Sequence, residues 1–448
     1  MVRAQEANVR RARLQRSSTW LRLLLVAWVT VGCGGPDDDD DTTGSPTEVQ
    51  VEGVDWSIHP EIESLIVVSW SQLAPATAYL EFAFDEGDWR QSPPETVGEG
   101  PQEQILAGIP YGADVLFRVV NDFGEGPLVT ADFEATAGPL PASLPPLELL
   151  TSDPARFDPA GRYLLGSINE DEGGWVVGTY WTFIIDRLGR VVWARPTPDR
   201  NFTIYVRVSV DGDDILIDEP TYWTDFDGGE GSRVHRIKLD GSVVQSYDTP
   251  GLHHAFVDLP DGSIVWGAAD EFDETLEKLL PDGTQETLWV CSEYLASIDY
   301  SLWCQSNTLY WDELSDSFLY SFYTFDSILQ VDHASGQVLR SFGQAPGSWA
   351  FDPEDAAFWF QHGCNYTAEG TLLTSSHWSV EDHQGVAREY ALDEEAQVLR
   401  EVWNFGLDDG IELEGAGEAH RLCSAQLIHH RFSLAIGDEL TGRYRYSC

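Results

Sequence analysis

Basic residues are scarce in this chain. Its 448 residues include 26 lysines and arginines against 75 aspartates and glutamates, which gives a formal net charge of -49. A surface of that sign repels nucleic acids and anionic lipid headgroups. We therefore expect neither of them as a partner. A negatively charged small substrate is also repelled at long range, so binding one requires a local pocket that favours it.

Cysteine spacings typical of metal sites are absent as well. None of the 6 cysteines forms a Cys-x-x-Cys pair or a zinc-type pattern, so we expect no metal and no other cofactor. Acidic clusters at residues 225–230 and 270–274 could bind calcium, but their spacing is not that of an EF-hand loop. We interpret both clusters as solvated acidic loops.

The N-terminus has no apolar run long enough to span a membrane. Six arginines within residues 3–22 precede an apolar run at 23–32, about half the length of a spanning helix. A basic segment, a short apolar run and a small residue predict an export signal over residues 1–32. Twin-arginine export, suggested by Arg10-Arg11, is a weaker alternative because the flanking residues match it poorly.

The residues around Cys33 resemble the lipobox of bacterial lipoproteins. Gly32 precedes Cys33, and an acidic, flexible tether follows over residues 33–47. Such a tether lets an anchored domain stand off a membrane. The resemblance implies lipidation at Cys33 and a location in the periplasm, the outer membrane or the cell surface. The alternative is an ordinary cleaved signal with a coincidental cysteine.

Export places the other cysteines in an oxidising compartment, where they can pair. Cys291 and Cys304 flank a short loop and are the preferred disulfide. Five cysteines remain besides Cys33, so at least one is a free or intermolecular thiol.

Two all-β regions follow the tether. With 42% hydrophobic and 12% aromatic residues, the chain has enough apolar surface for packed cores. Residues 48–137 alternate with the period of strands and contain an early Trp70, a pattern similar to a fibronectin type III-like β-sandwich. A Pro-rich linker is expected over residues 138–150.

From residue 151 to residue 448 we expect a six-bladed β-propeller. Strands joined by Asp-Gly-type turns recur there, and units with two such turns repeat every 45 to 55 residues, which is typical of four-stranded blades. The C-terminal run from Cys423 to Cys448 shows no clear hairpin. Either this tail closes the ring in an unusual form, or the last blade is degraded.

Four segments of the propeller region carry the residues suited to chemistry. They are His-His-Ala-Phe-Val-Asp within residues 252–265, Cys-Gln-Ser-Asn within 303–312, Ser-Phe-Tyr within 316–339, and Gln-His-Gly within 360–373. In this order they resemble the repeating core of the bacterial arylsulfate sulfotransferases, over roughly residues 160–420. That resemblance implies sulfuryl transfer between phenols through a sulfated histidine.

The resemblance assigns site residues one by one, and the match is partial. His254, or less well its neighbour His253, falls at the first family histidine, and His362 falls at the nucleophile. Gln305 stands where the family has a second histidine, and Tyr323 stands where it has an arginine. The two histidines at 429 and 430, and His377, match no motif, and we interpret them as structural or surface residues.

The two replacements bear on the chemistry. A glutamine donates a hydrogen bond but transfers no proton, and a tyrosine hydroxyl brings no positive charge. The sequence therefore leaves two functions open. One is a sulfotransferase-like enzyme that takes a phenolic sulfate donor and a phenol acceptor, with its activity reduced. The other is a non-catalytic propeller at the cell surface or in the periplasm that binds a ligand or a protein.

Overall fold

The computed structural model describes residues 48–85, 87–151, 163–170, 178–197, 203, 205–223, 228–270, 273–377, 379, 384–406, 417–422, 426–431 and 442–447. The expected signal, the lipidated Cys33 and the acidic tether lie outside these residues. Among the helices that these ranges contain, none combines the length and the apolar character needed to cross a bilayer.

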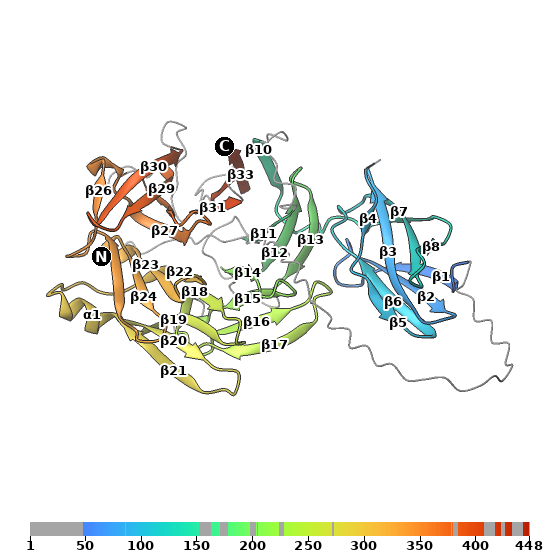
Figure 1. Cartoon of the computed structure of the whole chain (residues 1–448), viewed down its shortest axis with the longest axis horizontal. Helices are drawn as coiled ribbons and strands as arrows, with labels where there is room; N and C mark the ends of the chain where they lie inside the picture. Colours follow the sequence, from blue (N-terminus) through green and yellow to red (C-terminus); the bar gives the residue numbers. More distant parts are fainter. Residues whose placement is uncertain are drawn as a thin grey trace, which may run out of the picture.

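The fold is all-β, a six-bladed β-propeller preceded by a small fibronectin type III-like sandwich (Figure 1). One sandwich sheet contains β1 (Val51–Ile58), β2 (Ile66–Gln72) and β6 (Gly100–Leu106). The other contains β3 (Ala76–Phe84), β4 (Arg90–Gln91), β5 (Glu95–Val97), β7 (Asp114–Asp122), β8 (Pro127–Val129) and β9 (Phe133–Thr136). Burial alternates strictly along β3, so every second side chain enters the core between the sheets, where Trp70 is also buried.

Six sheets form the blades in the described part of the propeller. Blade 1 contains β11 (Tyr163–Asn169), β12 (Tyr180–Asp186) and β13 (Val191–Pro196). Blade 2 contains β14 (Val206–Val208), β15 (Ile215–Glu219), β16 (Arg233–Ile237) and β17 (Val243–Asp248), with the 3₁₀ turn η2 (Thr221–Trp223) between β15 and β16. Blade 3 contains β18 (Leu252–Asp258), β19 (Ile264–Asp270), β20 (Asp273–Leu279) and β21 (Gln285–Val290), and α1 (Cys291–Ser297) follows it.

The remaining blades complete the ring. Blade 4 contains β22 (Ser306–Asp312), β23 (Ser317–Phe322), β24 (Ser327–Asp332) and β25 (Val338–Gly343), with η3 (Tyr323–Phe325) between β23 and β24. Blade 5 contains β26 (Ala350–Asp352), β27 (Trp359–Tyr366), β28 (Leu372–His377), β29 (Gly385–Asp393) and β30 (Val398–Phe405), with η4 (Glu354–Ala356) before β27. Blade 6 contains β31 (Gly417–Leu422), β32 (Gln426–Arg431), β33 (Gly442–Ser447) and β10 (Leu147–Thr151).

Blade 6 corrects two expectations from the sequence. The C-terminal tail, in which no clear hairpin was expected, contains the antiparallel pair β32 and β33. The end of the expected linker is β10, which pairs in parallel with β33 from Leu147 opposite Gly442. The first and last strands of the propeller thus share one sheet, which leaves no open edge between them.

The Asp-Gly turns give the blades their hairpins. At residues 260–263, Gly262 has φ +85°, a conformation that glycine adopts without steric cost, and the Asp261 carboxylate accepts the Ser263 N–H at 2.9 Å. Within a blade, each hairpin pairs one strand with the next, and strands of neighbouring blades also contact each other. In particular, β22 lies in contact with β18 on one side and with β27 on the other.

Blade 1 contacts the sandwich directly. Tyr111 N–H donates to the Val191 carbonyl at 3.2 Å, and the Tyr163 hydroxyl lies 3.0 Å from Arg90. Arg190 forms ion pairs with Asp85 of the sandwich and with Asp186 of its own blade. These contacts fix the sandwich to the outside of the ring, away from its centre.

Candidate active site

The residues singled out in the sequence come from three neighbouring blades. His254 lies on β18, Gln305 precedes β22, Tyr323 begins η3, and His362 lies on β27. Both histidines are 1% exposed, Gln305 is 7% exposed and Tyr323 is 8% exposed. Because β22 contacts β18 and β27, the ring brings these distant segments to one place.

The inner strands lose regular pairing where these side chains lie. The register of β18 with β19 shifts between Leu252 and Phe256, and that of β27 with β28 shifts between Trp359 and Gly363. The histidines of both motifs fall inside the shifted stretches. A β-bulge turns side chains out of the regular alternation, which is why such features are frequent next to active sites.

His362 is held as a neutral imidazole in a defined tautomer. Its Nδ1 lies 2.9 Å from the Phe360 carbonyl, and because a carbonyl only accepts, Nδ1 carries the proton and Nε2 carries the lone pair. Burial lowers the pKa of His362 to about 3; the Phe360 carbonyl opposes this shift and nearby His377 adds to it. The imidazole therefore stays uncharged throughout the ordinary pH range.

Tyr323 and Gln305 sit beside this imidazole as a bonded pair. The ring of Tyr323 is parallel to that of His362, with centroids 6.3 Å apart, and its hydroxyl donates to Oε1 of Gln305. The exposed Trp303 packs edge-on against Tyr323 at 6.2 Å, so an aromatic wall leads from the surface to His362. The residues that replace the family arginine and second histidine thus bond to each other.

His254 belongs to the same electrostatic cluster. Burial lowers its pKa far below the ordinary value, and the neighbouring imidazoles of His253 and His362 lower it further. His253 and His254 are sequence neighbours, yet their rings lie 4.5 Å apart and their Nδ1 atoms are hydrogen-bonded. The bulge in β18 makes this possible, since neighbouring side chains on a regular strand point to opposite faces.

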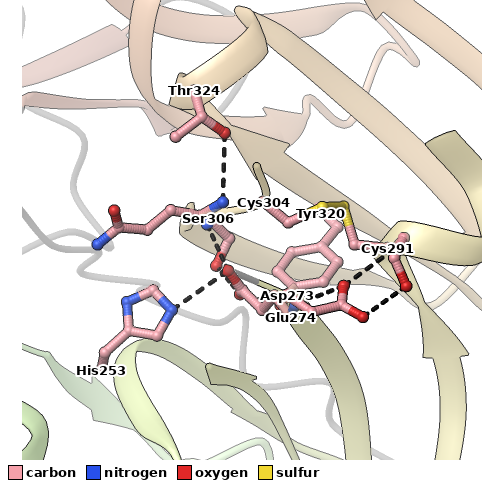
Figure 2. The surroundings of a disulfide bond; sticks show 10 residues. His253, Asp273, Glu274, Cys291, Cys304, Ser306, Tyr320 and Thr324 are labelled. Atoms are coloured by element: carbon pink, nitrogen blue, oxygen red, sulfur yellow. Dashed lines mark hydrogen bonds and ion pairs between the residues drawn. A yellow bond between two sulfur atoms is a disulfide. The ribbon is translucent and has the colours of Figure 1, made fainter. Parts of the chain in front are cut away.

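Glu274 is the functional candidate that the sequence analysis missed. It lies within residues 270–274, which we expected to be a solvated acidic loop, but its side chain is completely buried (Figure 2). Its Oε2 is 3.3 Å from Nε2 of His253 and accepts the Ser306 N–H at 2.6 Å; its Oε1 accepts from the hydroxyls of Ser306 and Tyr320. The expectation was wrong because β20 carries Glu274 on the inward face, beside Leu276.

The backbone before His362 is strained. Phe360 has φ +51° and Asp326 has φ +45°, the left-handed region that non-glycine residues rarely adopt. The two are joined, because the Asp326 carboxylate accepts the Phe360 N–H at 2.6 Å. Burial raises the pKa of Asp326 to about 6 despite that bond. The strained turn aims the Phe360 carbonyl at His362.

His377 was interpreted as a structural or surface residue, and the structure places it inside this region. It is 5% exposed, and its ring stacks on Phe360 with centroids 4.9 Å apart. It therefore supports the turn that positions His362. No signal in the sequence points to this role, because His377 reaches Phe360 only through the pairing of β28 with β27.

The expected disulfide between Cys291 and Cys304 is present and borders the site (Figure 2). It ties the start of α1 to the residue before Gln305. Beside it, Asp273 accepts from the backbone and the hydroxyl of Ser292, at 2.9 and 2.5 Å. Asp273 and the two sulfurs are close enough to hold a metal, but sulfurs bridged to each other are not thiolate ligands. Cys364, elsewhere on β27, is buried, and its thiol faces the Leu319 carbonyl at 4.0 Å.

Comparisons with known proteins give only distant likenesses. No protein-family model matches the chain, and no curated protein does. A protein of unknown function from Bacteroides caccae is 14% identical, with a TM-score of 0.41 over 61% of this chain and 83% of its own. Hsv2 from "Kluyvelomyces marxianus" is 10% identical, with a TM-score of 0.36 over 74% of this chain and 85% of its own. A protein described as a "putative gluconolactonase" is 13% identical, with a TM-score of 0.31 over 60% of this chain and 87% of its own. Likenesses as distant as these carry no argument, so the chemistry is argued from the geometry of the site.

Proposed function

We propose that this protein transfers a sulfuryl group from an aryl sulfate to a phenol, with His362 as the nucleophile. The observation that carries the proposal is the state of His362, which is buried, neutral, and bonded through Nδ1 to Phe360. An imidazole held in this way presents a lone pair on Nε2 and needs no base to remove a proton first.

The reaction has two steps. In the first, Nε2 of His362 attacks sulfur; the N–S bond forms while the bond from sulfur to the aryl oxygen breaks, and its electron pair leaves with the phenolate. In the second, the acceptor phenol gives up a proton, which balances the one that the departed phenolate takes up. Its oxygen attacks the same sulfur, and the electrons of the N–S bond return to Nε2. No oxidant or reductant enters either step.

The surroundings of His362 suit an aromatic donor. Tyr323, Phe360 and Trp303 form an apolar aromatic wall beside the nucleophile, against which an aryl ring can stack. Gln305 has its amide oxygen bonded to Tyr323, so its NH₂ group is the end that can donate to sulfuryl oxygens. Hydrogen-bond donors at that position stabilise charge as it develops on the transferred group.

The test is an assay with p-nitrophenyl sulfate as donor and a phenol as acceptor. His362→Ala is expected to reduce nitrophenol release to the uncatalysed rate. A matched control is His235→Ala, which removes a histidine from β16 in the outer part of blade 2, where it pairs with Glu219. Equal release by the wild type and His362→Ala would reject the proposal.

One observation favours a second candidate function, non-catalytic binding. The Tyr323 hydroxyl and the Gln305 amide satisfy each other, and neither brings the positive charge that an anionic transition state requires. In that case aryl sulfates or other aryl ligands bind near Trp303 without turnover. Calorimetric binding with no product separates this outcome from catalysis.

We also propose that the chain is exported and anchored by lipid at Cys33, with residues 33–47 as a tether. The support is the basic segment, the short apolar run and the cysteine in the sequence. Cys33→Ser is expected to abolish incorporation of labelled fatty acid and to release the protein from the membrane fraction. Unchanged labelling would contradict lipidation at this residue.

A further inference from the structure

A buried ion pair lies behind His254 and plays no part in the steps above. Glu274 and His253 are both 0% exposed, and their charged atoms are 3.3 Å apart. Burial raises the pKa of Glu274, but the charge of His253 and the donors Ser306 and Tyr320 outweigh it, and the pKa lies below the ordinary value. Glu274 is therefore an ionised carboxylate surrounded by donors.

The atoms are placed for a charge-assisted bond, because the Glu274 carboxylate faces Nε2 of His253 and accepts from it when that imidazole is protonated. Removing two charges from water costs several kcal/mol per ion, on the order of what their attraction returns, so the pair contributes little to folding. Ion pairs that add little stability and lie at the centre of a cluster of shifted groups are typical of functional sites. Tyr222, whose ring is 5.3 Å from that of His253, closes the other side of the pair.

The pair of Glu274 and His253 contacts His254 through the second nitrogen of His253. His253 contacts Glu274 through Nε2 and His254 through Nδ1, so its two nitrogens join the carboxylate to the second imidazole. When His253 carries both protons, its Nδ1–H donates to Nδ1 of His254. The proton of neutral His254 then lies on Nε2, because a neutral imidazole carries one proton and Nδ1 is the acceptor.

We propose that Glu274 and His253 are positioning residues that make His254 the acid which protonates the departing phenol. This inference rests on the function proposed above. It supplies the proton that Gln305, at the place of the second family histidine, is unable to transfer.

The proton transfer balances. As the bond from sulfur to the aryl oxygen breaks, Nε2–H of His254 gives its proton to the phenolate oxygen. Nδ1 of His254 takes the proton from Nδ1 of His253, which becomes neutral and keeps Nε2–H toward Glu274. In the second step the proton of the acceptor phenol returns by the same route. The carboxylate stays ionised throughout and gives up no proton.

The leaving group separates this role from a structural one. Phenol, with a pKa of about 10, needs a proton as it leaves, whereas the more acidic p-nitrophenol leaves as an anion. We expect Glu274→Gln to slow transfer from phenyl sulfate by on the order of 10²-fold and transfer from p-nitrophenyl sulfate by less than about 10-fold. The matched control is Glu277→Gln, the same change three residues along β20, where the carboxylate bonds to Thr287 instead.

The second readout does not depend on turnover. In the wild type, the imidazole proton between His253 and Glu274 is expected at low field in the proton NMR spectrum; Glu274→Gln removes it and Glu277→Gln keeps it. Equal slowing with both donors, or no slowing with either, would overturn the inference while the proposed function stands. A wild type that transfers from neither donor would overturn the proposed function itself, and the acid role of His254 with it.

Discussion

The sandwich and the propeller bury polar side chains in different ways. In the sandwich, Trp70 Nε1 donates to Gln72 at 2.9 Å and Asn121 donates to the same side chain at 3.2 Å, so the buried polar groups are neutral and bonded to each other. At the centre of the propeller, the carboxylate of Glu274 is buried against His253 beside two further imidazoles. Neutral amides meet the needs of folding at low cost, whereas buried charges do not. The difference agrees with the proposed function, which places the reacting groups at the centre of the propeller.

The largest effect on stability is expected from Glu274→Ala. This change removes the carboxylate from a buried pair and leaves His253 buried without it, and breaking a buried ion pair typically costs about 3–5 kcal/mol. The propeller transition should move to lower denaturant concentration, followed by tryptophan fluorescence. His253→Ala combined with Glu274→Ala removes both charges and is expected to recover part of the loss. A double variant no more stable than Glu274→Ala would show that charge is not the cause.

In the sandwich the corresponding change is Leu80→Ala. Leu80 is 0% exposed on β3, so the cavity is expected to cost about 3 kcal/mol in the sandwich transition. Sulfuryl transfer should be unchanged, because Leu80 packs inside the sandwich core and the sandwich residues Tyr111 and Arg90 contact the propeller at blade 1. The measurement is paired denaturation and activity; a loss of activity before unfolding would mean that the two regions are coupled.

Removing the disulfide should have a slightly smaller effect. Cys291→Ser with Cys304→Ser opens a loop with a sequence separation of 13, which corresponds to about 2–3 kcal/mol. Since Cys304 precedes Gln305, the transfer rate is expected to fall as well. Reduction of the wild type by dithiothreitol serves as a parallel measurement. An unchanged transfer rate in both the double variant and the reduced wild type would show that the disulfide stabilises the blade without positioning Gln305.

The smallest effect is expected from Asp326→Asn. The pKa of Asp326 is raised to about 6 from 3.8, so the folded state binds a proton more tightly and the wild type loses stability as pH rises from about 4 to about 6. Asparagine keeps an acceptor for the Phe360 N–H and tolerates the left-handed conformation, but it does not ionise. The variant should therefore gain stability relative to the wild type above pH 6, measured by thermal melts across that range. A constant difference at every pH would contradict the assignment.

The sequence predicted the blades because their turns are local. A hairpin built on Asp261 and Gly262 follows from the conformational freedom of glycine and needs no distant partner. The sixth blade was harder, because β10 and β33 are separated by most of the chain and pair only when the ring closes. The few apolar residues of β10, which follow a Pro-rich stretch, do not predict pairing with a strand at the other end of the propeller.

The sequence named candidate residues where motifs contain them, and it missed neighbours that join them only through tertiary contacts. His254, Gln305, Tyr323 and His362 stand in recognisable segments, and the structure brings them together. Glu274 resembled part of a solvated loop, although its alternation with Leu276 on β20 was a usable signal for an inward-facing side chain. The bulge that turns His253 and His254 toward each other depends on the pairing of β18 with β19, which a sequence does not specify.

In the proposed reaction, Nε2 of His362 forms a bond to sulfur. The direct measurement is mass spectrometry of protein quenched in base shortly after mixing with p-nitrophenyl sulfate without an acceptor. We predict one added SO₃ group on the peptide that contains His362, which disappears when a phenol is supplied before the quench. Nitrophenol release without any adduct, or an adduct that persists in His362→Ala, would contradict the account.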